Sequence, residues 1–271
     1  MYHNVVIFGA GASVDAGIPM MNSFIDTMWN YATRGKIGDK IISDAERQIL
    51  IDADHIRRDL EPLNSRAFFN NYDLEDILSL LSFEALTSEK RTQDYNTFVK
   101  AVASTIELSC SYVFSNEPNT RVVRGIYNDL WHALLNKNLG EACPALITFN
   151  YDLVLERTLW ESFSSGNPYK TKRNSCGLNY FYGISDFSVE KDSRGVPRFN
   201  RENKPEIEIP YLKLHGSLNW DRRWTDSHSK GQRITPPSYP TQVVEEPLIL
   251  PPVFNKMNSS VNSVWNVALE I

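Results

Sequence analysis

The chain has little cysteine, and its few thiols argue against two kinds of stabilising site. Its 271 residues include only Cys110, Cys143 and Cys176, which are far apart and form no C-x-x-C pair. Scattered cysteines in odd number predict neither a disulfide framework nor a cysteine zinc site, and favour free thiols in a reducing compartment. We expect no metal, since no metal-ligand spacing is found among His3, His55, His132 and His228.

Long apolar runs and a basic leader are also missing. No apolar segment approaches the ~18–20 residues that cross a bilayer. The first strand-like segment follows the N-terminus directly, without a basic region and an apolar core before it. We therefore expect a cytoplasmic protein without a signal peptide or a membrane partner.

The chain lacks an excess of basic charge. Lys and Arg number 28 against 33 Asp and Glu, which gives a formal net charge of −5. Nucleic acid is therefore not indicated as the main partner, although a local basic patch stays possible.

What the chain does contain is a set of short, continuous apolar runs typical of buried strands. Val5–Phe8 and Ala145–Phe149 are rich in β-branched or aliphatic residues, as strands of a parallel sheet are. Tyr211–Leu214 and Leu248–Leu250 predict further strands. Residues 161–205 are polar and predict long loops or a small irregular module, and residues 221–245 predict loops.

Between the first two strands the apolar residues recur every three or four positions, which predicts helices. The stripes are Met21, Phe24, Ile25, Met28 and Tyr31; Leu74, Ile77, Leu78 and Leu81; Phe98, Val102 and Ile106; and Val123, Ile126, Leu130 and Leu134. We predict an α/β fold: a Rossmann-like parallel sheet flanked by helices from residues 1–39 and 141–271, with a helical layer or subdomain inserted at 40–140.

A glycine-rich segment follows the first predicted strand: Gly9-Ala10-Gly11-Ala12-Ser13. Glycine lets the backbone approach a phosphate, the N–H groups of a following helix favour the anion, and Ser13 can add a hydroxyl donor. Val14 stands where a third glycine is common, and no acidic residue follows at the dehydrogenase position about 20 residues later. The segment thus predicts phosphate or dinucleotide binding without hydride transfer; a tight turn that binds nothing is the alternative.

Two polar motifs follow later strands. Asn150 and Asp152 come after Ala145–Phe149, at the strand end where open α/β sheets bind ligands. Asn150 can orient a hydroxyl or a water, whereas Asp152 can accept from a ribose hydroxyl or cap the next helix. His215, with Gly216 after it, ends the strand Tyr211–Leu214 and is suited to proton transfer near neutral pH, although a lone histidine is more often structural.

Together and in this order, the three motifs resemble those of the sirtuin superfamily. Gly9–Ser13 with Ala16–Pro19 is similar to the opening NAD loop, Thr148–Asp152 to the Asn/Asp motif under the nicotinamide ribose, and His215-Gly216 to the catalytic histidine motif. The resemblance implies that Asn150 and His215 are catalytic, and that NAD contacts Gly9, Ala10, Gly11, Ala12, Ser13, Thr148, Asp152, Gly216 and Ser217.

The resemblance is greatest to the sirtuin-like domains of bacterial antiphage defence proteins. It rests on Lys213–Trp220 and on the later Leu250-Pro251-Pro252. Deacetylating sirtuins carry a four-cysteine zinc module, which is missing here, and a Phe-Arg pair where Met20-Met21 follows Pro19. Both differences argue against protein deacylation, which stays an alternative together with ADP-ribosylation. Hydrolysis of NAD as substrate, without metal, is the main expectation.

Three further expectations follow from the resemblance. Such an enzyme depletes NAD in defence, so control by a homo-oligomer or by a regulatory partner protein or domain is expected. A pocket that only senses NAD or ADP-ribose is the second alternative. The family adds a strand after the helix that begins near Val261, so we expect the C-terminal end of the fold to be missing after Ile271.

Overall fold

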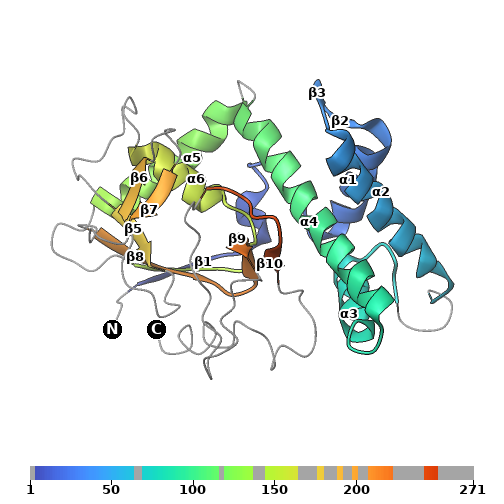
Figure 1. Cartoon of the computed structure of the whole chain (residues 1–271). Coiled ribbons are helices and arrows are strands. Elements are labelled where there is room, and N and C mark those ends of the chain that lie inside the picture. Colours follow the sequence, from blue (N-terminus) through green and yellow to red (C-terminus); the bar gives the residue numbers. More distant parts are fainter. Residues whose placement is uncertain are drawn as a thin grey trace. The chain divides into compact units, whose positions relative to one another are not determined.

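Figure 1 shows the computed structural model of the chain, which describes residues 4–63, 69–115, 119–136, 144–163, 176–179, 188–191, 197–200, 207–221 and 241–249. These residues form two compact units. The sheet unit takes the described residues among Met1–Ser13 and Glu117–Ile249, and the helical unit takes those among Val14–Asn116. This division differs from the sequence-based boundaries at 39 and 140, which stay a prediction.

The sheet unit contains the parallel sheet that the sequence predicts. Its strands are β1 (Val5–Phe8), β4 (Ala145–Thr148), β8 (Ile207–Lys213) and β5 (Cys176–Asn179), in the order β1-β4-β8-β5. In the register, Phe8 pairs with Thr148, and Thr148 pairs with Lys213. Three neighbouring strands therefore end at the same level, and the segments that follow them start side by side.

Two helices flank this sheet, α5 (Asn119–Asn136) and α6 (Val154–Phe163). They pack against each other, and the buried indole of Trp131 on α5 donates a hydrogen bond of 3.0 Å to the Thr158 hydroxyl on α6. The coarse architecture, a mixed α/β fold with a parallel sheet and flanking helices, is confirmed.

The prediction of a fully buried first strand is wrong. Ala145 and Leu146 on β4 are completely buried, whereas Val5 is 40% and Ile7 63% exposed on β1. The reason lies in the strand order: β4 has a strand on each side, whereas β1 pairs with β4 alone among the described strands. Its apolar composition was therefore a poor guide to its burial.

The strand predicted at Tyr211–Leu214 begins earlier than that run. Pro210 cannot donate to a sheet ladder, so residues 206–209 are expected to be at best an edge piece or a lead-in to the strand. β8 runs through Pro210: β5 pairs with Ile207–Pro210, and β4 pairs with Tyr211–Lys213. Pro210 thus lies where the pairing changes from one neighbour to the other.

Antiparallel strands complete the described part of this unit. β9 (Gly216–Asp221) pairs with β10 (Pro247–Ile249), and β6 (Ser188–Lys191) with β7 (Pro197–Asn200). The predicted strand near Leu248 is confirmed, whereas part of the region expected to form loops contains β5, β6 and β7. The helix expected from Val261 lies outside the described residues.

The glycine-rich segment differs from the expected strand-turn-helix unit. It forms the short 3₁₀ helix η1 (Ala10–Ser13), and α1 (Met21–Arg34) begins only after a further turn. The expectation that a helix N-terminus directly follows the glycines is therefore wrong, and the helix dipole of α1 carries no argument for phosphate binding at Gly9.

The helical unit is built around α4 (Glu89–Ser115), against which α1, α2 (Asp44–Asp59) and α3 (Leu74–Glu84) pack. The predicted stripes on α1, α3 and α4 are buried, among them Met28, Leu78 and Phe98. The unit also contains η2 (Glu61–Leu63) and a short hairpin of β2 (Lys36–Ile37) and β3 (Lys40–Ile41).

Local signals explain where these helices begin. Ser43 and Glu46 form a capping box on α2, and the Asp73 carboxylate accepts from two backbone N–H groups at the start of α3. None of the helices in the described residues combines the length and apolar character that a bilayer-spanning helix needs.

Candidate functional site at the carboxyl edge of the sheet

The three sequence motifs meet at the carboxyl edge of the parallel sheet. The ladder continues one step past β1 and β4, since Phe149 N–H donates to Phe8 C=O (3.2 Å) and Leu214 N–H to Thr148 C=O (2.9 Å). Asn150 and His215 follow these pairs on neighbouring strands, and Gly9 follows β1. The fold thus brings together residues that are more than 130 positions apart in sequence.

Asn150 is held in one orientation by the glycine segment. Its side-chain amide nitrogen donates to Gly9 C=O (3.0 Å) and to Ser13 Oγ (2.8 Å). Both amide hydrogens are used in this way, so the carbonyl oxygen Oδ1 is the atom that can accept a hydrogen bond from a ligand. The half-buried Asn150 side chain is therefore an oriented acceptor for a water or a ribose hydroxyl.

Ser13 and Asp152 form the next links of the same chain of hydrogen bonds. The Ser13 hydroxyl donates to Asp152 Oδ2 (2.6 Å), and Asp152 Oδ1 accepts from Val154 N–H (3.0 Å), the first residue of α6. Ser13 is 4% and Asp152 6% exposed. Asp152 thus has the capping role considered for it. The Ser13 hydroxyl donates its hydrogen bond to this carboxylate, so it does not donate to a phosphate in this arrangement.

His215 lies between two aromatic rings that come from the end of β4. The Phe149 ring meets it edge to face at 5.2 Å between centroids, and the Tyr151 ring lies at 6.2 Å. The Tyr151 backbone is itself fixed, since its C=O accepts from Leu218 N–H at 3.0 Å. The half-buried imidazole therefore has a defined position beside the Asn150 segment.

Gly216 allows the chain to turn directly after this histidine. Its φ of 89° lies in the left-handed region, and a Cβ atom there would come within 2.1 Å of Leu248 C=O on β10. Ser217 is fully buried, and its hydroxyl donates to Asn219 Oδ1 at 2.7 Å. Both residues serve the turn and the β9–β10 pair in this structure.

The glycine segment presents an open surface. Gly9, Ala10, Gly11 and Ala12 are all exposed, and a Cβ added at either glycine would meet nothing within 4 Å. Neither glycine has a positive φ. The turn is closed by Ala12 N–H on Gly9 C=O (2.9 Å), and Tyr127 of α5 donates to Ala12 C=O.

Sequence reasoning missed a buried charged pair beneath the site. The Lys213 ammonium lies 3.0 Å from Glu156 Oε1, both side chains are fully buried, and Tyr211 donates to Glu156 Oε2 at 3.3 Å. Lys213 also donates to the backbone C=O groups of Asp152 and Tyr151. The pair thus ties β8 to the segment that carries Asn150.

The environment of this pair shifts the titration of its acid. Burial raises the pKa of Glu156 above its ordinary value, and the charge of Lys213 offsets part of the rise. The available signals were a lysine that ends an apolar strand and a glutamate that directly follows the apolar run Leu153–Leu155.

The polar residues of the candidate site therefore differ in what they can offer a ligand. The Thr148 hydroxyl accepts from Asn150 N–H at 3.0 Å and is buried, as are Ser13, Asp152 and Ser217. Asn150, the half-buried His215 and the exposed turn are therefore the candidates to contact a ligand. In the described part of the chain, no group of three His, Cys, Asp or Glu side chains is arranged to hold a metal ion.

Comparison with known proteins adds no relative to this description. No protein-family model matches the chain, and no curated protein matches it significantly.

Proposed function

We propose that this chain hydrolyses the nicotinamide–ribose bond of NAD, releasing nicotinamide and ADP-ribose. One observation carries the proposal: Asn150, His215 and the exposed glycine turn follow three neighbouring parallel strands at one level. Open α/β sheets bind their ligands at this edge. The resemblance of the three motifs to sirtuins adds NAD as the dinucleotide, and bacterial antiphage defence by NAD depletion as its setting.

The reaction needs an oriented water and a proton acceptor. The bond between ribose C1′ and the nicotinamide nitrogen breaks with its electron pair passing to the ring, which neutralises the positive charge of the leaving group. An oxocarbenium-like ribose is then attacked by water. Asn150 Oδ1 accepts a hydrogen bond from that water or from a ribose hydroxyl, and His215 takes the proton as general base.

The exposed turn supports the binding half of the proposal. Gly9 to Ala12 carry no side chain larger than a methyl group and are open to solvent, so a pyrophosphate can approach the backbone closely. Ser13 contributes indirectly, because it accepts from the Asn150 amide and so fixes the direction of Oδ1.

The test is chromatographic measurement of NAD, nicotinamide and ADP-ribose after incubation with the protein. His215→Ala and Asn150→Ala should each lower nicotinamide release by about a hundredfold or more, as loss of a general base or an oriented acceptor does. His132→Ala, on the exposed face of α5, is the matched control and should retain full activity. Wild-type turnover by both site variants would refute the assignment.

A sensing pocket is the second candidate function, and one observation favours it. The hydroxyls and carboxylate of Ser13, Thr148, Asp152 and Ser217 all make internal hydrogen bonds, which leaves few groups for chemistry. Calorimetry that detects NAD or ADP-ribose binding by a protein with no measurable nicotinamide release would support sensing over hydrolysis.

A further inference from the structure

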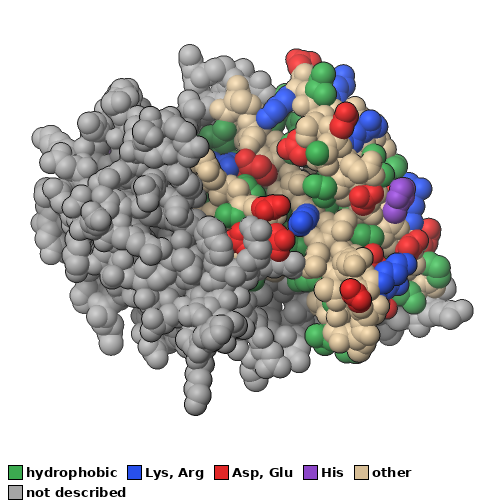
Figure 2. Space-filling model, in the orientation of Figure 1, with side chains coloured by type: hydrophobic (Ala, Val, Ile, Leu, Met, Phe, Trp, Pro, Cys, Tyr) green, Lys and Arg blue, Asp and Glu red, His purple; other side chains and the backbone are tan. Residues whose placement is uncertain are grey.

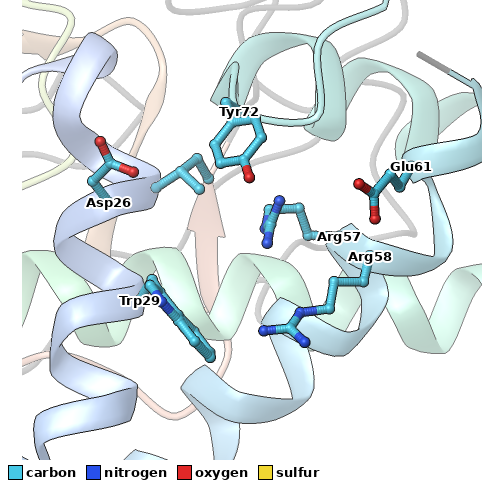
Figure 3. A pocket seen from close by; sticks show the side chains of 7 residues that line it. Asp26, Trp29, Arg57, Arg58, Glu61 and Tyr72 are labelled. Atoms are coloured by element: carbon cyan, nitrogen blue, oxygen red, sulfur yellow. The ribbon is translucent and has the colours of Figure 1, made fainter. Parts of the chain in front are cut away.

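A second site lies in the helical unit and belongs to none of the motifs above. It is a pocket of about 280 Å³ lined by Asp26 and Trp29 of α1, Arg57 and Arg58 of α2, Glu61 of η2, and Tyr72 before α3. Figure 3 shows these side chains around a common space, with the Tyr72 hydroxyl directed into it. Both arginines, both acids and both aromatic rings come from this unit alone.

The two arginines are fixed in place by one buried carboxylate. Asp54 is 2% exposed; its Oδ1 accepts from Arg57 Nε (3.0 Å) and from an Arg57 amino nitrogen (2.8 Å), and its Oδ2 pairs with Arg58 Nε (2.7 Å). Two guanidinium groups on one carboxylate leave one net positive charge. Each arginine has five N–H donors, so several stay available to an anionic ligand.

Aromatic faces border the same arginines. The Arg57 guanidinium lies 4.7 Å from the centre of the Tyr72 ring, and that of Arg58 lies 5.0 Å from the Trp29 ring. Tyr72 is nevertheless 57% exposed and Trp29 37% exposed. Exposed rings beside guanidinium planes are the surfaces on which planar heterocycles stack.

The acids restrict the ligand further. Asp26 and Glu61 accept hydrogen bonds but cannot donate when ionised, and neither forms an ion pair with any residue that the structure describes. With these two acids, Arg57, Arg58 and Asp54 carry a net charge of −1, so a simple anion would meet repulsion unless it also donates hydrogen bonds to the acids. A suitable ligand carries a negative group that contacts the arginines, a flat ring that stacks on the aromatic side chains, and N–H groups that donate to the acids.

We propose that this pocket binds a nucleoside monophosphate. The phosphate contacts Arg57 and Arg58, the base stacks beside Trp29 or Tyr72, and its amino or ring N–H groups donate to Asp26 or Glu61. The pocket volume of about 280 Å³ is at the lower end of the range of small-molecule sites, which suits a mononucleotide better than a dinucleotide. On the described part of the face in Figure 2, basic and acidic side chains are interspersed, which favours one small nucleotide over a long nucleic-acid backbone.

Calorimetric titration of the full chain tests the proposal, with GMP as probe because guanine presents adjacent N–H and NH₂ donors. Guanosine and inorganic phosphate are titrated separately, and each should bind at least about tenfold more weakly than GMP, since each makes only part of the contacts. Arg58→Gln should weaken GMP binding by about tenfold or more. Arg34→Gln makes the same charge change at an exposed site outside the pocket and should have no effect.

Two further variants keep the result interpretable. Tyr72→Ala removes an exposed ring and should also weaken GMP binding, with circular dichroism confirming that each variant is folded. Asn150→Ala should bind GMP normally, which separates this pocket from the proposed NAD site. GMP binding that is lost in Asn150→Ala but kept in Arg58→Gln would overturn the assignment.

Other results would also overturn it. If inorganic phosphate binds as tightly as GMP, the pocket is a plain anion site. If a single-stranded oligonucleotide binds and GMP does not, it is part of a nucleic-acid surface. If GMP does not bind at all, the arginines and rings only hold α2 against its neighbours.

Discussion

Single residues in the candidate site act through one another. Asn150 donates to Ser13, Ser13 donates to Asp152, and Asp152 accepts from the start of α6. The direction of the chain follows from chemistry, because a carboxylate can only accept and an amide nitrogen can only donate. The acceptor Oδ1 of Asn150 is therefore oriented by a serine and an aspartate that themselves are almost fully buried.

Gly216 gives the sharpest prediction at this scale. Gly216→Ala should lower the free energy of unfolding by about 3 kcal/mol, since it adds a methyl group at positive φ and drives it into the β10 backbone. Urea unfolding monitored by fluorescence measures the change. β9 and β10 should then separate, and His215, one residue earlier, should lose its fixed position.

Gly125 offers a matched control for this substitution. It lies in α5, and a Cβ atom there meets nothing within 4 Å, so Gly125→Ala should raise stability by about 0.5–1 kcal/mol through helix propensity. Equal effects of the two substitutions would contradict the role assigned to Gly216.

Residue types and their order in sequence were enough to predict that Asn150 and His215 follow strands, since polar residues after apolar runs mark the ends of strands. The partners of these residues could not be predicted in the same way. Ser13 and Asp152 are 139 positions apart, and only the parallel register of β1 and β4 makes them neighbours.

At the scale of elements, a buried ion pair connects β8 to α6. Lys213 and Glu156 are both fully buried, and the lysine also donates to two backbone carbonyls between Asn150 and α6. A buried pair of this kind adds little net stability but defines which atoms can meet. It fixes how the β4 end approaches the β8 end.

This pair predicts how stability varies with pH. The folded pKa of Glu156 lies above the ordinary value of 4.5, so its contribution to stability is complete below that value and is lost as pH rises through the raised pKa. Glu156→Gln removes the titration while keeping a group of similar shape. The stability of wild type relative to the variant should fall by about 1.4 kcal/mol for each pH unit within this window.

Urea unfolding of both proteins from about pH 4 to about pH 8 measures the difference, taken at each pH so that other titrating groups cancel. A difference that stays constant, or that grows as pH rises, would contradict the raised pKa of Glu156.

Element types were more predictable than element environments. Apolar stripes every three or four residues gave α1, α3 and α4, because a helix with one buried face requires that period. Burial of β1 could not be predicted, since an apolar run does not say how many strands lie beside it. Pro210 did not end the strand, because its missing N–H matters only where a partner strand faces it.

At the scale of the whole molecule, the two units differ in how far apart in sequence their contacting residues lie. The sheet unit joins β1 to β4 across more than a hundred intervening residues. The described residues of the helical unit all fall within Val14–Asn116, and their core, including Met28, Leu50 and Phe98, is made within that stretch. Local contacts of this kind were visible in the sequence as apolar stripes. The sequence also placed β1 in one sheet with strands after residue 141, but not its register with β4.

The described residues of the helical unit lie within one stretch of the chain and have their own core, so this stretch should fold alone. A fragment of residues 14–116 is predicted to give a helical circular dichroism spectrum and a single cooperative thermal transition, as small domains with one core do. It contains every residue of the arginine and aromatic pocket, so it should also bind GMP with the affinity of the full chain.

A fragment that shows coil-like dichroism, or melts without cooperativity, would mean that this core needs the sheet unit to form. The exposed glycine turn and His215 lie outside the fragment, so it should release no nicotinamide from NAD, which would locate any such activity in the sheet unit.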